Sequence, residues 1–130
     1  MLQITPQHRL LLAVEPVDFH AGIDGLKAVC QQHLLCDPFN GTIFAFANRA
    51  RTSVKLLTYD ASGFWLAQKR FSQGKLAWWP KDNSKTVTLR ASEFQILLAQ
   101  GHPMKAAIPQ DWRPLKISYA AEAKEDNKLS

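Results

Sequence analysis

The chain of 130 residues is long enough for one domain with its own core, and 46% of its residues are hydrophobic, which excludes a globally disordered protein. Its longest apolar runs, residues 10–14 and 42–47, are too short to span a bilayer. The first residues lack the basic start and apolar stretch of a secretory signal, so we expect a cytoplasmic protein. Cys30 and Cys36 do not make a disulfide framework and are expected to stay reduced.

The net charge of +5 is distributed unevenly along the chain. Residues 1–48 carry two basic and four acidic side chains, and residues 91–130 carry five of each. Residues 49–90 carry nine basic side chains against two acidic ones, so the whole excess lies in the middle third. Such a block is typical of a surface that binds a polyanion, although a merely solubilising face would have the same composition.

The first third predicts a strand followed by a helix. Residues 9–14 form a short apolar run that Glu15-Pro16 closes, as in a buried strand. Ile23, Leu26, Cys30 and Leu34 then recur at helical spacing, which predicts an amphipathic helix over residues 21–35. Asp18 is a candidate cap, because its carboxylate can accept from the unpaired N–H groups of the first turn.

The middle of the chain predicts an antiparallel meander. After the turn DPFNG (residues 37–41), strands are expected at residues 42–47, 53–59 and 64–71, and the connections at 48–52 and 60–63 are short enough for hairpins. Residues 75–79 are a weaker strand candidate, and the alternating residues 85–89 suggest a last strand.

The last third predicts a closing helix and a polar tail. Ser92 with Gln95 matches a capping box, and Gly101 with Pro103 is placed to end the helix. The sequence therefore predicts one α+β domain over residues 1–115, made of a strand and helix, an antiparallel β-meander and a C-terminal helix. Residues 116–130 are polar and expected to fray.

An up-and-down meander would bring several basic side chains to one edge of the sheet. Its alternate turns, 48–52 and 72–74, lie at the same end, so residues distant in sequence meet there. Within the hairpin of residues 53–71, Lys55 falls opposite either Gln68 or Lys69, depending on the loop length. The candidate nucleic-acid-binding residues are Arg49, Arg51, Lys55, Lys69, Arg70 and Lys75.

Aromatic residues interleave with these charges and allow two interpretations. They could stack on unpaired bases, or they could belong to the core or to a protein interface. For Trp65, inside a predicted strand, we expect a core position. The candidate protein-interface residues are Phe64, Trp65, Trp78 and Trp79.

Three long motifs resemble one family of small proteins. VEPVDFHAGIDGL (residues 14–26), DPFNGTIFAFANR (37–49) and VKLLTYDASGFWLAQKRFSQGKLAWWP (54–80) are similar to the TnpB-type accessory proteins of the insertion-sequence-sixty-six transposon family. The likeness runs from about residue 12 to residue 101. This family is distinct from the RNA-guided nucleases that share the name TnpB.

The resemblance implies a role in transposition rather than a chemistry. It implies that the protein is encoded beside another small protein and a transposase that carries the catalytic acidic triad, and that it assists transposition as a member of a family with no established enzymatic activity. The chain departs from the family at His20-Ala21, where an arginine and a second basic residue are common. If that position contacts phosphate, binding by this chain should be weaker or pH-dependent.

Catalytic and metal-binding signatures are scarce in the sequence. It contains no P-loop, dinucleotide glycine motif or nucleophile elbow, and we expect neither an enzyme nor a cofactor. His20, Cys30, His33 and Cys36 are of the right type for zinc but lack paired CxxC spacing, so a packed Cys30 and a surface His33 are the preferred interpretation.

Three hypotheses follow for the function. The first is a non-catalytic accessory protein that binds DNA phosphates with little sequence specificity. The second is an adaptor that docks on the transposase or its small partner without touching DNA. The third is a nuclease, which would need metal-dependent cleavage that is lost on changing Asp18 or Asp37. No membrane and no small-molecule substrate is expected.

Overall fold

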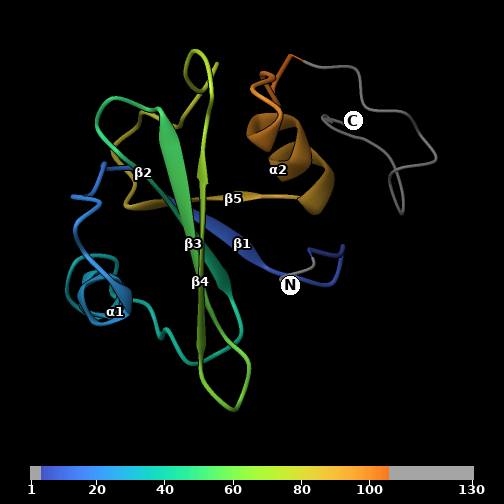
Figure 1. Cartoon of the computed structure of the whole chain (residues 1–130). Coiled ribbons are helices and arrows are strands. Elements are labelled where there is room, and N and C mark those ends of the chain that lie inside the picture. The colour runs from blue at the N-terminus through green and yellow to red at the C-terminus, as the bar shows by residue number, and fades with distance from the viewer. Residues whose placement is uncertain (1–3, 106–130) are drawn as a thin grey trace.

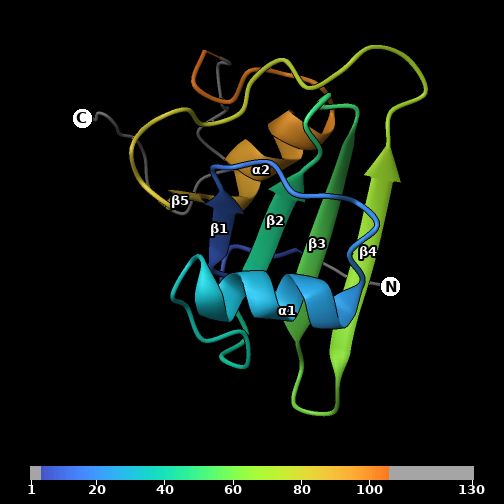
Figure 2. The same cartoon turned by 90° about the vertical axis from the view of Figure 1, so that its left-hand side faces the viewer.

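The structure, a computed structural model, describes residues 4–105, which form a five-stranded sheet with one helix on each face, as Figure 1 and Figure 2 show. The elements in chain order are β1 (Leu10–Ala13), α1 (Ile23–Gln32), β2 (Ile43–Ala47), β3 (Ser53–Tyr59), β4 (Phe64–Arg70), β5 (Thr86–Leu89) and α2 (Ala91–Leu98). The predicted α+β class, with a meander and a C-terminal helix, is confirmed.

The strand order β4-β3-β2-β1-β5 places the first strand between the meander and the last strand. β1 and β2 are parallel neighbours that α1 connects, whereas all other neighbours are antiparallel. The late strand β5 thus completes the sheet on β1, far from the strand that precedes it. β4 and β5 are the two edges.

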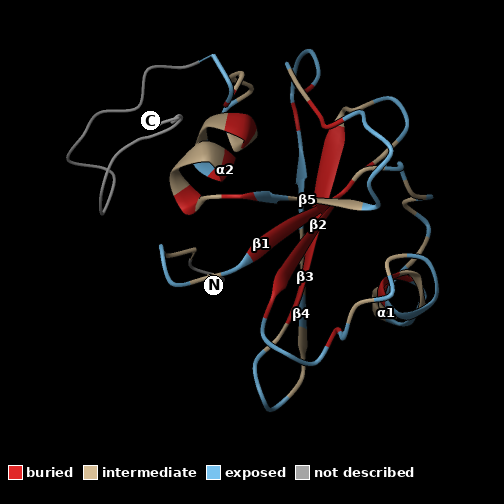
Figure 3. Ribbon diagram, turned by 180° about the vertical axis from the view of Figure 1, so that it is seen from behind, coloured by how far each residue is buried: buried red, intermediate tan, exposed pale blue. Residues whose placement is uncertain are grey.

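Both faces of the central strands are covered, and this explains their composition. Every residue of β1 (LLLA) and β2 (IFAFA) is buried, without the polar alternation of a strand that has one wet face (Figure 3). β4 differs, because none of its residues is fully buried and its last three residues are exposed. Solvent exposure of the sheet therefore increases from β2 through β3 to β4.

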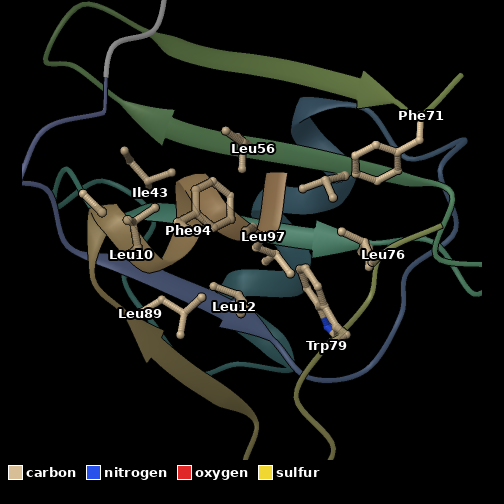
Figure 4. Packing of buried hydrophobic residues seen from close by; sticks show 14 residues of the cluster. Leu10, Leu12, Ile43, Leu56, Phe71, Leu76, Trp79, Leu89, Phe94 and Leu97 are labelled. Carbon is tan, nitrogen blue, oxygen red and sulfur yellow. The ribbon is translucent and has the colours of Figure 1, made fainter. Parts of the chain in front are cut away.

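Two apolar clusters hold the layers together. On one face, Leu10, Ile43 and Leu56 of the sheet pack with Phe94 and Leu97 of α2, as Figure 4 shows. On the other face, a second cluster lies between the sheet and α1, and its buried members are Leu11, Ala13, Leu26, Cys30, Phe44, Phe46 and Leu57. The alternation of side chains along each strand divides one sheet between two cores.

Two predicted helix caps are wrong. α1 begins after Gly22, which makes no side-chain capping bond, and Asp18 lies too far ahead in the chain to reach the first turn. α2 begins at Ala91, one residue before Ser92, and its first turn is held by Glu93, whose carboxylate accepts from the Arg90 N–H (2.9 Å). The capping interaction therefore lies two residues before the predicted box.

Residues 75–79 do not form a strand, contrary to the weaker expectation. Leu76 donates one backbone hydrogen bond to the Arg51 carbonyl (2.8 Å), and the chain then turns inward. Trp79 is 3% exposed, and its indole N–H donates to the Ala13 carbonyl (2.9 Å). The segment is therefore held by the burial of the Trp79 side chain and not by pairing with a neighbouring strand.

α2 ends in a turn with a left-handed residue, which is Gln100 (φ 63°) and not the expected Gly101. The Gln100 N–H donates to Leu97 O and the Gly101 N–H to Ile96 O, the paired bonds of a Schellman motif. The polar tail predicted for residues 116–130 lies outside the described residues. Over the part of the chain that the structure describes, no helix is long and apolar enough to cross a membrane.

Candidate nucleic-acid interface

The connection between β2 and β3 is shaped by one asparagine. The Asn48 side-chain oxygen accepts from the N–H groups of Thr52 (2.9 Å) and Ser53 (3.1 Å), and its amide donates to the Thr52 hydroxyl (2.9 Å). These bonds close the loop tightly, with Arg51 in a left-handed conformation (φ 62°). Arg49 and Arg51 are thereby held at the tip of a fixed turn.

The segment after β4 is tied to the same end of the sheet. Its Phe71 N–H donates to Thr52 O (3.0 Å), and its Leu76 N–H donates to Arg51 O (2.8 Å). From the turn that ends α2, the Gln100 side-chain amide donates to the carbonyls of Gln73 and Lys75. This role of Gln100 has no signal in the sequence, because its partners lie 27 and 25 residues back along the chain.

Four cations therefore meet at one end of the sheet, which Figure 2 shows as its upper end. Three of them are exposed and Arg51 is partly exposed. Within residues 4–105, none has a carboxylate within 4.0 Å of its charged nitrogens. We call this surface the basic end, and its members are Arg49, Arg51, Arg70 and Lys75.

Lys55 does not belong to this surface. The register places it opposite Gln68, one of the two predicted alternatives, but it is only 6% exposed. Its ammonium donates to the carbonyls of Phe19 (2.7 Å) and Ala21 (2.9 Å) and lies 5.0 Å from the centre of the Phe19 ring. The charge is used inside the protein to fix the segment before α1.

Lys69 is exposed, but its ammonium has a partner. It donates to the Leu98 carbonyl (2.7 Å) at the C-terminal end of α2, where the helix dipole favours a cation. In the strand, Lys69 and Arg70 project from opposite faces of the sheet. Lys69 therefore projects from the face of the sheet that α2 covers, whereas Arg70 projects from the opposite face.

A shallow groove of about 460 Å³ lies where two of the quoted motifs meet. Asp18 and Phe19 line it from the first motif, and Asn48 and Arg49 line it from the second. Asp18 accepts from the backbone N–H of His20 (2.9 Å) and lies 2.9 Å from its Nδ1, and these bonds lower the pKa of the Asp18 carboxyl. His20 itself is 98% exposed at the side chain.

The four candidate aromatic residues differ in burial: one is exposed, two are partly buried and one is buried. Trp65 is 46% exposed, so the expected core position is wrong; its indole N–H donates to Asp60 (2.6 Å). Phe64 is partly buried in a cluster with Phe39 and Tyr59, whose ring centres lie 5.0–5.2 Å apart. Trp78 and Trp79 both pack against the α2-side core. Of the four candidate interface residues, only Trp65 is exposed; Phe64 and Trp78 are partly buried.

The zinc-type residues do not form a ligand cluster, although the Cys36 N–H donates to the Cys30 carbonyl (2.8 Å). Cys30 is buried, which raises the pKa of its thiol to about 12, and His33 is exposed, as the sequence suggested. The Cys36 thiol donates to the Leu34 carbonyl (3.4 Å). Among residues 4–105, no three His, Cys, Asp or Glu side chains converge as a metal site would require.

These features define a small α+β protein that presents a cationic surface at one end of its sheet and an exposed tryptophan, Trp65, toward the other end of β4. The model of the family described as "IS66 Orf2 like protein" matches residues 8–107, and the chain belongs to this family. It is a family of accessory, non-catalytic transposition proteins, and membership supports a transposition-associated accessory role.

Two relatives from Sinorhizobium fredii share this sequence pattern. The uncharacterized protein y4jC is 35% identical over 92 residues, which cover 70% of this chain and 77% of the relative. The uncharacterized protein y4hO is 26% identical over 112 residues, which cover 84% and 92%. No solved structure matches the chain.

Proposed function

We propose that this protein assists transposition by binding the DNA backbone through its basic end. The observation that carries the proposal is the convergence of Arg49, Arg51, Arg70 and Lys75 from three separate loop and strand positions. Each lacks an acidic neighbour within the described part of the chain, so its charge is available to a phosphate. Binding of this kind reads the backbone and discriminates little between sequences.

The salt dependence of binding gives a quantitative test. Four phosphate contacts predict a slope of roughly −3.6 in log affinity against log salt for duplex DNA, which is a loss of about 150-fold between 50 and 200 mM salt. Fluorescence anisotropy with a labelled duplex of arbitrary sequence measures this slope. A slope near zero, or no binding at low salt, would contradict the proposal.

A matched pair of charge reversals separates the basic end from net charge. Arg49→Glu with Arg70→Glu changes the net charge by the same amount as Arg9→Glu with Lys27→Glu, but Arg9 lies before β1, at the other end of the sheet, and Lys27 lies on α1. We expect the first pair to abolish binding and flatten the slope, and the second to keep most of the affinity. Equal losses would show a diffuse charge effect.

The second candidate function is an adaptor for the transposase or its small partner, and the exposure of Trp65 favours it. Large exposed aromatic side chains are enriched where proteins bind one another. Co-purification with the transposase that is lost in Trp65→Ala, while DNA binding by the purified chain is absent, would support this function over the first.

A further inference from the structure

The outer edge of β4 is a complete and regular strand edge. β4 stands last in the sheet order, and all seven of its residues pair with β3 without a bulge. β5, at the other edge, has four residues. Exposed edges usually carry a proline, a bulge, a cover or charged side chains that prevent further pairing. β4 contains no proline and no bulge, and its charged side chains are confined to its last two residues, Lys69 and Arg70.

The hydrogen bonds at the two ends of the hairpin show which backbone groups face outward. The Asp60 N–H donates to Gly63 O, and the Phe71 N–H donates to Thr52 O. Because bonded positions alternate along an antiparallel ladder, residues 65, 67 and 69 bond to β3. The residues whose N–H and C=O groups point away from the sheet are Phe64, Leu66, Gln68 and Arg70.

We propose that a second copy of this chain pairs antiparallel with the β4 edge, with the two-fold axis at Ala67. In this register each outward-facing residue of one copy meets an outward-facing residue of the other, so the whole edge is used. Phe64 lies opposite Arg70 of the second copy, and Trp65 lies opposite its Lys69. Two sheets thus become one continuous ten-stranded sheet, built from two copies of the five-stranded order.

The side chains of β4 favour this register over one shifted by four residues and over a parallel arrangement. Each cation faces an aromatic ring, an attractive pairing directly across strands. Moving the strands four residues out of this register sets Lys69 directly opposite Lys69 of the second copy, where like charges repel. A parallel, in-register arrangement brings the same two charges together. The exposed Trp65, at 46%, is the side chain that gains cover.

Removal of one outward N–H tests the backbone pairing. Gln68→Pro deletes a donor that β3 does not use, a position where an edge strand tolerates proline. Sedimentation equilibrium of the full chain should show a monomer–dimer equilibrium, and this variant should weaken the dimer by about tenfold or more, because two bonds are lost across the axis. Gln68→Ala keeps the N–H and should keep the dimer. A wild type that stays monomeric to near-millimolar concentration overturns the proposal.

The register has its own test at Trp65. Trp65→Lys would oppose Lys69 of the second copy, whereas Trp65→Glu would attract it, so we expect the glutamate variant to dimerise at least about tenfold more tightly. Within one chain the order reverses, because Asp60 lies beside residue 65 and favours lysine. Monomer stability therefore cannot produce the expected ranking. Equal dimerisation of both variants overturns the register.

Arg70 belongs both to the basic end and to the proposed pairing, but the dimer and DNA binding can be tested separately. Gln68→Pro changes no charge and lies outside the basic end, so it can lose the dimer while the protein still binds DNA as a monomer.

Discussion

The buried ammonium of Lys55 allows the sharpest prediction. Lys55→Met removes the charge and both hydrogen bonds to Phe19 and Ala21 but keeps an unbranched apolar stem in the same place. We expect a destabilised protein in which the segment before α1 loosens first. The same variant, while folded, should bind DNA as tightly as the wild type, because this ammonium does not reach the surface.

The magnitude follows from the geometry. A hydrogen bond from a charged donor contributes about 1.5–3 kcal/mol, and Lys55 makes two. Removing an ammonium from an interior also recovers part of its desolvation cost, and the two carbonyls belong to partly exposed residues that water can reach. We therefore expect a net loss of roughly 2 kcal/mol in the free energy of unfolding, about 8 °C in Tm.

Urea unfolding at constant pH, followed by tryptophan fluorescence, measures this loss through the midpoint and slope. Lys55→Arg is the matched control for charge, since a guanidinium has a different reach and geometry and should restore only part of the stability. A Lys55→Met midpoint that corresponds to a change below about 0.5 kcal/mol would refute the reasoning, because the two bonds would then contribute nothing net.

Three further predictions concern the core, the hairpin and the end of α2. Burial raises the pKa of the Cys30 thiol to about 12, so alkylation at pH 8 should label only the chain's other cysteine until the protein is unfolded, as mass spectrometry of the intact chain would show. The Trp65 N–H is the main cause that lowers the pKa of Asp60, so Trp65→Phe should raise that pKa toward its ordinary value in an NMR titration. A lowered folded-state pKa adds stability above about pH 4 that is lost as the pH falls through it, and the variant should lose less on acidification. Gly101→Ala would place a Cβ 2.7 Å from the Ile96 Cγ2 and should cost about 1–3 kcal/mol in urea unfolding.

Local patterns predicted the meander well. β3 has the predicted bounds, and β2 and β4 differ from them by one residue. Short turns and apolar runs carry this information within a few neighbouring residues. The position of β1 between β2 and β5 carries no such local signal, because pairing partners far apart in sequence depend on how the layers pack.

The candidate site was predicted in outline and changed in detail. The expectation that two alternate turns share one end placed Arg49, Arg51, Arg70 and Lys75 correctly near one another. The burial of Lys55 was not predicted, because a lysine side chain in a strand normally points to water. Its ammonium is buried because the segment before α1 supplies the two carbonyls that accept its hydrogen bonds. Its burial depends on tertiary structure rather than on the sequence around it.

The exposure of Trp65 has a similar explanation. A tryptophan in a strand is usually buried, but β4 is an edge and its hairpin end extends past the helices that cover the central strands (Figure 1). Trp79, in an irregular segment, is instead one of the most buried aromatic side chains. Both residues are tryptophans, so their different burial is set by their positions in the fold and not by residue type.

The late arrival of β5 also affects how the chain is made. On the ribosome, β1 to β4 emerge first, with one face of apolar side chains that includes Leu10 and Ile43. That face and the outer edge of β1 stay uncovered until β5 and α2 are synthesised, after residue 85. A nascent chain that stalls before this point would therefore expose an apolar surface to chaperones and to other nascent chains. Synthesis of the last 20 described residues covers this surface.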